Sequence, residues 1–229
     1  MRYIVKRREP TTVTATRAAP TTDLSTSERA RAAFNQIDKA AVRRTLANEQ
    51  GALCAFCMLR IDPEAVAPPS KGAHPEPTMK IAHRTPIDVD SMQALKWNNL
   101  LGSCDGGQRS GRYKWTCDAA QGPKALVVDP TQAGSCARLR YERRDARMGL
   151  FITSDDPALK ADVEDKLGLN TGDLPELRQK AWEAFRVQQQ KSAPKRYGRP
   201  AWVAYYETWI KQFGAQLPEM LGVIEAKLR

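Results

Sequence analysis

The sequence predicts an α+β fold, in which a mainly helical protein also contains a small β-hairpin. Helix-starting signals and helical spacing of apolar residues occupy 25–49 and most of the chain after 157. Two strand-like segments, 137–143 and 150–153, flank a turn and predict the hairpin. Between these regions, the window 53–122 contains four of the five cysteines. We expect two domains: an N-terminal strand, helix and cysteine-rich core at 1–130, and the hairpin with a helical region at 131–229.

The composition favours a soluble globular protein whose partner is a polyanion. Of the 229 residues, 41% are hydrophobic and 27% are charged, and no apolar run is long enough to span a membrane. The first eight residues lack the apolar stretch of a signal peptide, so we expect a cytoplasmic protein. The net charge of +10 favours nucleic acid as a partner, although solubility alone explains the charge equally well.

The individual elements follow from breakers and caps. Ser25 and Glu28 have the spacing of a capping box, and Gly51 is a natural helix stop. Before residue 130 we expect a strand at 2–6, a connector at 11–22, a helical segment at 25–49 with a break near 35–38, strands at 59–61 and 79–83 around a proline-rich loop at 62–78, and short helices after Asp90 and Cys117. Beyond it we expect a buried strand at 125–128, the hairpin, helices at 157–167, 174–190, 201–213 and 218–228, and a basic linker at 191–200.

The cysteine spacing predicts a structural zinc site. Cys54 and Cys57 are separated by two residues, and Cys104 and Cys117 follow 46 residues later with twelve residues between them. Thiolates suit tetrahedral Zn²⁺, and a CxxC turn places two sulfurs on one ion. The alternatives are buried apolar cysteines or a thioredoxin-like redox pair, but the strand and long helix that flank a redox pair are missing. We therefore favour zinc, and we expect Cys136 to be a packing residue.

Three polar residues in the same window have the chemistry of a hydrolytic site. His83 ends an expected strand, and an imidazole with a pKa near neutrality can activate water as a general base. Asn99 can supply a backbone or side-chain contact that orients this ring. Asp118 can hold a divalent ion against a phosphate. The alternative for each residue is an ordinary surface or core position.

The order of these segments resembles the HNH endonucleases that carry zinc-binding cysteines. The resemblance covers about 1–130 and rests on Gly51–Cys57, Lys80–Pro86, Trp97–Cys104 and Cys117–Gly122. More narrowly, Met1–Ile4, Glu49–Cys57 and Trp97–Leu100 resemble the HNH subunits of Septu-type antiphage defence systems, some of which are associated with retrons. The resemblance implies a ββα-metal (HNH) finger with structural zinc, embedded in the mainly helical protein.

Roles for individual residues follow from the resemblance. It implies that His83 is the base, that Asn99 is the middle asparagine that orients it, and that Asp118 binds catalytic Mg²⁺ or Mn²⁺. Cys54, Cys57, Cys104 and Cys117 would hold the structural Zn²⁺. Two departures from the family pattern stand out: Ala82 replaces the acidic or histidine residue that commonly precedes the base, and Gln121 stands where lysine is frequent.

Basic and aromatic residues near the window suit a nucleic-acid substrate. Arg109, Arg112, Lys114 and Trp115 lie between the second pair of cysteines, and Arg84 follows the predicted base. The alternative is a solvated loop with Trp115 folded back on the zinc site. A second basic cluster lies at the hairpin and consists of Arg138, Arg140, Arg143, Arg144 and Arg147.

The helical C-terminal region presents one apolar face, formed by Trp202, Tyr205, Tyr206, Trp209, Ile210 and Phe213. We expect this face to pack on the chain's own core. The functional alternative is a partner surface, since the Septu resemblance implies an ATPase partner subunit.

These observations predict a metal-dependent HNH endonuclease that hydrolyses phosphodiester bonds of DNA or RNA as the nuclease subunit of a bacterial antiphage system. The alternative is a catalytically impaired, zinc-containing nucleic-acid-binding or scaffold subunit, which Ala82 favours. A third hypothesis is a thiol oxidoreductase that uses Cys54 and Cys57.

Overall fold

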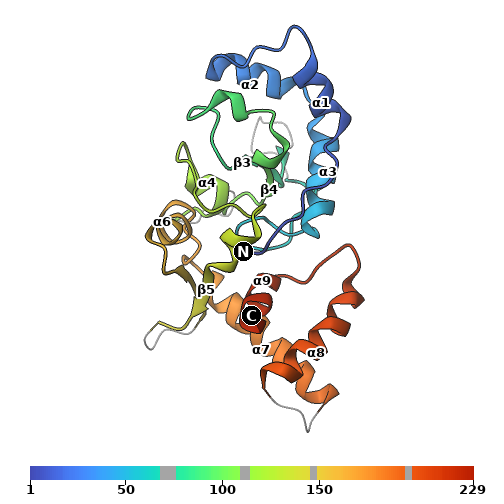
Figure 1. The fold of residues 1–229 in the computed structure, drawn as a ribbon, viewed down its shortest axis with the longest axis vertical. Coiled ribbons are helices and arrows are strands. Elements are labelled where there is room, and N and C mark those ends of the chain that lie inside the picture. Colours follow the sequence, from blue (N-terminus) through green and yellow to red (C-terminus); the bar gives the residue numbers. More distant parts are fainter. Residues whose placement is uncertain (68–75, 109–113, 145–148, 194–197) are drawn as a thin grey trace.

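A computed structural model describes residues 1–67, 76–108, 114–144, 149–193 and 198–229 (Figure 1). Helices dominate, and the strands form antiparallel two-stranded pairs. The elements are, in chain order, α1 (Thr11–Ala18), α2 (Ser27–Gln36), α3 (Lys39–Gln50), β1 (Val66–Ala67), β2 (Glu76–Pro77), β3 (Lys80–His83), η1 (Ser91–Gln93), η2 (Trp97–Asn99), β4 (Leu100–Ser103), α4 (Cys117–Gln121), α5 (Ala133–Ala137), β5 (Leu139–Glu142), β6 (Phe151–Ser154), α6 (Pro157–Ala161), η3 (Asp162–Lys166), α7 (Leu174–Ser192), α8 (Arg199–Trp209), η4 (Ile210–Phe213) and α9 (Leu221–Leu228).

The N-terminal helices lie at one end of the molecule and the C-terminal helices at the other, with β3, β4 and α4 between them (Figure 1). β3 and β4 run antiparallel, and their register pairs Lys80 with Ser103 and His83 with Leu100. α4 contacts β3, so two strands and one short helix form a ββα unit at the centre. The N-terminus of the chain also lies in this central region (Figure 1).

The predictions for the first 22 residues were wrong in two places. Residues 2–6 are not a strand in the structure, because their backbone pairs with no strand among the described residues; the Ile4 amide donates to the Pro130 carbonyl at 2.8 Å. Residues 11–18 form α1 rather than part of a connector. The reason is tertiary: Val13 is completely buried, and the Thr12 hydroxyl accepts a hydrogen bond from the Asp38 amide at 2.8 Å.

The next helical segment has the predicted break. α2 and α3 are separated at Ile37, and Asp38 caps α3 by accepting hydrogen bonds from the Ala40 and Ala41 amides. The cap of α2 is Thr26 rather than Ser25, one residue later than the capping box predicted. Gly51 ends α3 with φ of 66°, as predicted, because a left-handed residue at this position suits glycine.

The central strands were predicted in part. β3 is confirmed over Lys80–His83, whereas 59–61 contributes only an isolated bridge between Leu53 and Arg60. Residues 125–128 are not a strand, since the amides of Val127 and Val128 donate to the carboxylate of buried Asp162. β4 was not predicted, because four residues followed by a cysteine loop leave too short a pattern to recognise. Residues 68–75 of the proline-rich loop, His74 among them, lie outside the described residues.

The C-terminal half follows the prediction closely. β5 and β6 form the antiparallel hairpin, with Leu139 opposite Ser154, although residues 145–148 of its turn lie outside the described residues. The predicted helices are present, and the first of them continues as the π-helix η3. The apolar face of α8 packs on α7: Trp182 contacts Trp202, and Phe185 contacts Trp209 at 5.1 Å between ring centroids. The expectation that this face covers the chain's own core is confirmed.

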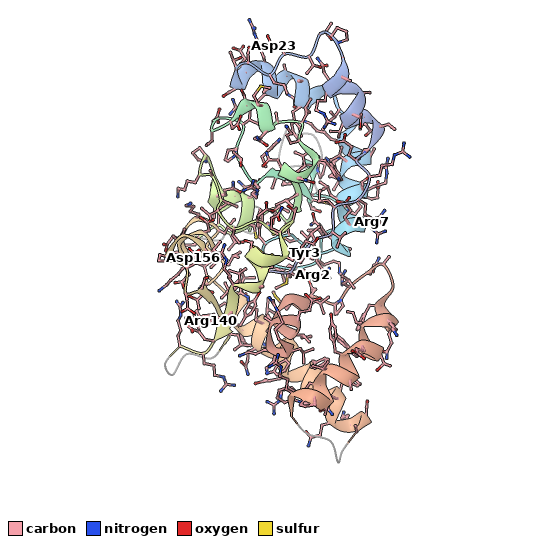
Figure 2. The ribbon with its side chains drawn as sticks, in the orientation of Figure 1. Arg2, Tyr3, Arg7, Asp23, Arg140 and Asp156 are labelled. Atoms are coloured by element: carbon pink, nitrogen blue, oxygen red, sulfur yellow. The ribbon has the colours of Figure 1, made fainter. Side chains whose placement is uncertain are left out.

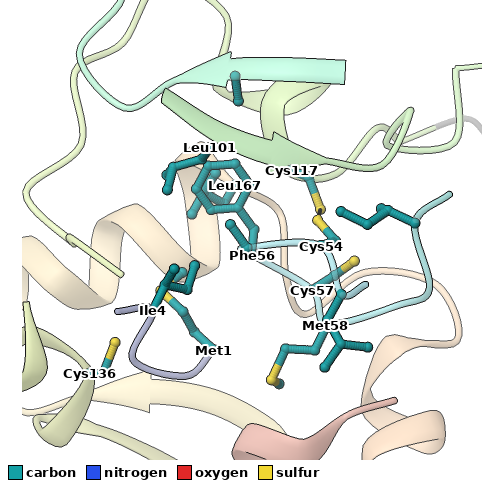
Figure 3. Close-up of a cluster of buried hydrophobic side chains, with 14 of the residues drawn as sticks. Met1, Ile4, Cys54, Phe56, Cys57, Met58, Leu101, Cys117, Cys136 and Leu167 are labelled. Atoms are coloured by element: carbon teal, nitrogen blue, oxygen red, sulfur yellow. Dashed lines mark hydrogen bonds between the residues drawn. The ribbon is translucent and has the colours of Figure 1, made fainter. Parts of the chain in front are cut away.

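One cluster of buried apolar side chains runs through both halves of the chain. It includes Met1, Ile4, Phe56, Leu101 and Leu167, and it continues to Ile224 in α9 (Figure 3). Residues on both sides of position 130 therefore share a core. No helix in the described part of the chain is long and apolar enough to cross a membrane.

Candidate zinc site and adjoining hydrolytic site

The four predicted zinc ligands come together in the structure. The sulfur atoms of Cys54, Cys57, Cys104 and Cys117 all lie within 4.8 Å of one another. The Sγ–Sγ distance is 3.8 Å between Cys54 and Cys117 and 3.7 Å from Cys104 to both Cys57 and Cys117. With Zn–S bonds of about 2.3 Å, the edges of a tetrahedral site are about 3.8 Å long. The sulfur positions therefore fit Zn²⁺.

The backbone of both ligand-bearing segments is held in an unusual conformation. The amide of Cys54 donates to the Leu59 carbonyl at 2.8 Å, which closes the turn that contains Cys57. Met58, within this turn, has φ of 66°, and Cys117 has φ of 57°. Left-handed residues other than glycine cost about 1–3 kcal/mol each and persist where the surroundings hold them. An ion bound by the adjacent sulfurs would be such a constraint.

The thiols need a cation to ionise together. Cys54, Cys57 and Cys117 are buried, and all five cysteines of the chain are free. Without an ion, neighbouring sulfurs, those of Cys104 first, raise the pKa of the Cys57 and Cys117 thiols well above the ordinary value. A divalent ion held by these sulfurs would reverse this effect, since coordinating thiols are deprotonated.

The fifth cysteine lies apart from this group. Figure 3 shows Cys54, Cys57 and Cys117 gathered on one side of the core and Cys136 on the other. Cys136 is buried, and burial raises the pKa of its thiol to about 11. It is therefore a packing residue, as predicted. The grouping of Cys54 and Cys57 with two further cysteines is not what a two-cysteine redox pair requires.

His83 lies at the end of β3 with one ring nitrogen engaged. Its Nε2 atom is 3.0 Å from the carbonyl oxygen of Ala94, and the Phe34 ring meets the imidazole edge-on at 4.6 Å between centroids. Because a carbonyl only accepts, Nε2 carries the proton and Nδ1 keeps its lone pair. Burial lowers the pKa of His83, with smaller contributions from the charges of Lys39 and Arg31. The ring is therefore neutral at pH 7 and suited to accept a proton.

Asn99 is buried and fixes the loop that follows His83. Its side-chain oxygen accepts from the Thr85 amide at 2.8 Å, and its nitrogen donates to the carbonyls of Thr85 and Gln93 at 2.9 and 3.1 Å. The Asn99 carbonyl also accepts from the Arg84 amide at 3.0 Å. Asn99 thus holds the backbone of Arg84 and Thr85, which follow His83, and that of Gln93, which precedes Ala94. Its neighbour Asn98 is exposed.

Asp118 follows Cys117, one of the four clustered cysteines, in α4. Burial raises the pKa of this carboxyl to about 6, and the charge of Lys80 opposes the shift. Gln121, three residues later in α4, is buried and places its Nε2 atom 3.0–3.1 Å from the carbonyls of His83, Arg84 and Lys124. Gln121 therefore ties the helix that carries Asp118 to the strand that carries His83.

His83 and Asp118 line the same hollow, of about 490 Å³, which also includes Ile81, Asp88 and Gly122. Ala82 points elsewhere: it is 1% exposed and alternates with Ile81 and His83 along β3. A carboxylate at position 82 would thus enter the core in this arrangement rather than the hollow. In the described part of the chain, the His, Cys, Asp and Glu side chains that lie close enough to share one ion, in a group of three or more, are those of the four cysteines.

The structure places the predicted phosphate-binding residues in different environments. Arg84 forms an ion pair with Asp129 at 3.3 Å and donates to the Leu126 carbonyl at 3.0 Å, so its side chain is held within the protein. Arg109 and Arg112 lie outside the described residues. Lys114 is exposed, and Trp115 is 52% exposed rather than folded on the cysteine cluster.

The second basic cluster, at the hairpin, is neutralised by nearby carboxylates. Arg140 pairs with Asp155, and Arg138 pairs with Asp156 at 2.7 Å; Figure 2 shows Arg140 and Asp156 at the same edge of the molecule. Arg144 pairs with Glu164. These contacts compete with any phosphate for the same guanidinium groups. Arg147 lies outside the described residues.

Other charged residues near the hollow were not predicted. Arg31 and Asp88 line it and form an ion pair with each other. Lys39, Arg43 and Lys80 line an adjoining hollow. For Lys39 and Arg43 the sequence did hold a signal: they are four residues apart on one helix, with no acidic residue at the spacing that would pair them.

The chain matches no protein-family model and no curated protein sequence. The class of site is therefore defined by its own geometry: a four-cysteine cluster that fits a metal ion, joined through α4 to a hollow with a histidine and an aspartate.

Proposed function

We propose that the protein is a metal-dependent HNH endonuclease that hydrolyses phosphodiester bonds of nucleic acid. The observation that carries the proposal is the β3–β4–α4 unit, in which His83 ends one strand, Asp118 lies on the helix, and both side chains line one hollow. The four-cysteine cluster supports it, because Cys117 begins the same helix and Cys104 directly follows β4. The net charge of +10 suits a polyanionic substrate.

In this mechanism, His83 Nδ1 takes a proton from the attacking water. The Ala94 carbonyl holds the proton on Nε2 and so keeps the ring in the required tautomer. Asn99 fixes the loop that begins at Thr85, and through the Arg84 amide it fixes the end of β3. Gln121 holds α4 against the same strand end, which sets the position of Asp118 relative to His83.

Asp118 is the residue that would hold Mg²⁺ or Mn²⁺. Asp118 is half-buried, and a divalent cation would offset the burial of its charge that raises the pKa of the carboxyl. Mg²⁺ commonly takes one or two protein carboxylates plus water and phosphate oxygens. When bound, the ion stabilises the negative charge that develops on the phosphate. Cys54, Cys57, Cys104 and Cys117 would hold the Zn²⁺, whose role would be structural because four protein ligands leave no open position.

The resemblance to the HNH subunits of Septu-type systems supports a more specific role. We propose that the protein acts in the bacterial cytoplasm as the nuclease subunit of an antiphage defence system, together with an ATPase subunit. Copurification with an ATPase encoded next to the gene tests this part, and a gene neighbourhood without an ATPase contradicts it.

A catalytically impaired nucleic-acid-binding or scaffold subunit is the second candidate. Ala82 favours it, since the family commonly places a metal-binding side chain there. The burial of Ala82 weakens the argument, because the hollow is lined by Ile81 and His83 instead. The two candidates differ in one measurable property, which is cleavage that depends on a divalent ion.

Replacing His83 with alanine separates them. We expect the wild-type protein, purified with any partner, to nick DNA or RNA when Mg²⁺ or Mn²⁺ is added, and His83→Ala to lose at least about a hundredfold in rate, the usual contribution of a general base. Zinc content and the melting temperature show whether the variant is folded. Undiminished cleavage by folded His83→Ala refutes the mechanism, and no cleavage by the wild type under any of these conditions favours the binding subunit.

A further inference from the structure

A second hollow, of about 330 Å³, adjoins the one that contains His83. The two hollows share Ile81 and Asp118. α2 and α3 provide Phe34, Lys39 and Arg43 on one side, while Pro77, Met79 and Lys80 lie on the side of β3. The second hollow therefore extends from the hydrolytic site toward the N-terminal helices.

Its lining is strongly cationic. Among the described residues that line it, Lys39, Arg43 and Lys80 are basic and Asp118 is acidic. The Lys39 ammonium lies 4.9 Å from the centre of the Phe34 ring, and Phe34 in turn contacts His83, so the cationic wall reaches the predicted base. Burial lowers the pKa of Lys39, and the positive charge of Arg43 lowers it further.

Arg43 is the residue that most clearly needs an anionic ligand. Its Nε atom is buried and has no hydrogen-bond partner among the residues that the structure describes. A buried donor without a partner costs about 1–3 kcal/mol. The next residue, Arg44, is different: it points to solvent and pairs with Glu64 at 3.3 Å. One helix thus carries two adjacent arginines, one paired and one oriented into the hollow.

We propose that Lys39, Arg43 and Lys80 form the binding site for the phosphodiester backbone of the nucleic acid that His83 cleaves, an inference that rests on the proposed function. A guanidinium presents a planar fork of donors that matches phosphate oxygens, and an ammonium supplies a point charge. The cations lie beside Asp118, so a strand held by them runs directly into the hydrolytic hollow. The site contacts phosphates and leaves the bases free, which predicts binding without strong sequence preference.

The test compares Arg43→Gln with the matched control Arg44→Gln. Both variants lower the net charge by one from the same helix, so a general charge effect is identical in the two. Binding is measured by fluorescence anisotropy with labelled single-stranded DNA, duplex DNA and RNA, at several salt concentrations and without added divalent ion. The three oligonucleotides identify which phosphodiester polymer the site accepts.

We expect Arg43→Gln to raise Kd about tenfold and to reduce the slope of log Kd against log salt concentration by about one, the loss of one phosphate contact. The Kd of Arg44→Gln should stay within about twofold of the wild-type Kd. Arg43→Lys, which keeps the charge but loses the fork, should give an intermediate Kd. Equal Kd changes in Arg43→Gln and Arg44→Gln, or wild-type binding by Arg43→Gln, overturn the proposal, provided that zinc content shows folded protein. If Arg43→Gln folds poorly, Lys39→Gln replaces it with the same expected outcomes.

Failure of the proposed function gives a different pattern. If Arg43→Gln loses binding while the wild type shows no cleavage with Mg²⁺ or Mn²⁺, the phosphate site stands and the nuclease proposal fails. If the wild type cleaves and Arg43→Gln both binds and cleaves like it, the nuclease proposal stands and the phosphate site is wrong.

Discussion

Replacing Cys117 with serine should remove the metal and much of the stability of the protein, whereas replacing Cys136 should not. Both side chains are buried, at 0% and 2% exposure, so the two substitutions place the same hydroxyl in comparably enclosed positions. They differ in their surroundings. Cys117 Sγ has sulfur neighbours at 3.7 and 3.8 Å, while Cys136 Sγ contacts the Pro130 carbonyl at 3.9 Å.

The expected magnitudes follow from this difference. A buried hydroxyl without a good partner costs about 1–3 kcal/mol, and each kcal/mol lowers the melting temperature of a chain of this size by about 2–4 °C. Cys136→Ser should therefore melt about 2–12 °C below the wild type. Cys117→Ser adds the loss of a zinc ligand, and structural zinc contributes about 10–16 kcal/mol in small zinc domains, comparable to the total stability of a domain. We expect it to fall at least about 20 °C or to fail to fold.

The assay is zinc content by elemental analysis together with thermal unfolding, with and without a chelator. The wild type and Cys136→Ser should contain one zinc per chain and should lose stability when the chelator is added. Cys117→Ser should contain less zinc and should respond less to the chelator. Wild-type protein that purifies without zinc, or equal losses of melting temperature in the two serine variants, would refute the reasoning from sulfur geometry.

Two further predictions concern His83 and the buried Asn99. Asn99→Ala should lower the free energy of unfolding by about 2–4 kcal/mol in chemical denaturation, because it leaves both backbone groups of Thr85 without their side-chain partner. Replacing the exposed Asn98 with alanine should change the free energy of unfolding by less than about 0.5 kcal/mol. Similar effects of the two substitutions would contradict the assigned contacts. Burial lowers the pKa of His83 below 6.5, so the unfolded chain binds this proton at a higher pH than the folded protein. The stabilisation from a neutral His83 is complete above about pH 6.5 and is lost as the pH falls, so His83→Gln should lose less stability than the wild type between about pH 7.5 and 5.5. Equal losses of stability in His83→Gln and the wild type over this pH range would show that His83 is not the titrating group.

Sequence patterns succeeded where local chemistry decides the structure. The break near 35–38 and the helix end at Gly51 were predicted, because breakers and a left-handed glycine act within a few residues of themselves. The hairpin β5–β6 and the C-terminal helices likewise follow from short-range alternation and spacing. The same reasoning failed at residues 2–6 and 11–18, where a distant carbonyl and the burial of Val13 determine the backbone.

The contacts within the site depended on the tertiary structure. Spacing alone could not show that Cys54 and Cys117, 63 positions apart, approach to 3.8 Å. It also could not distinguish Arg43 from Arg44, which differ only in the direction that the helix gives them.

The sequence by itself determined the kind of chemistry available, because residue type fixes what a group can bind: four thiols for zinc, one imidazole for a proton and a surplus of cations for phosphate. The tertiary structure decided which of these groups can act together. Arg84 is held by Asp129, whereas Lys39 and Arg43 face a hollow that reaches Asp118. The physical reason is that a charge is useful to a ligand only where folding leaves it without a closer partner of the opposite sign.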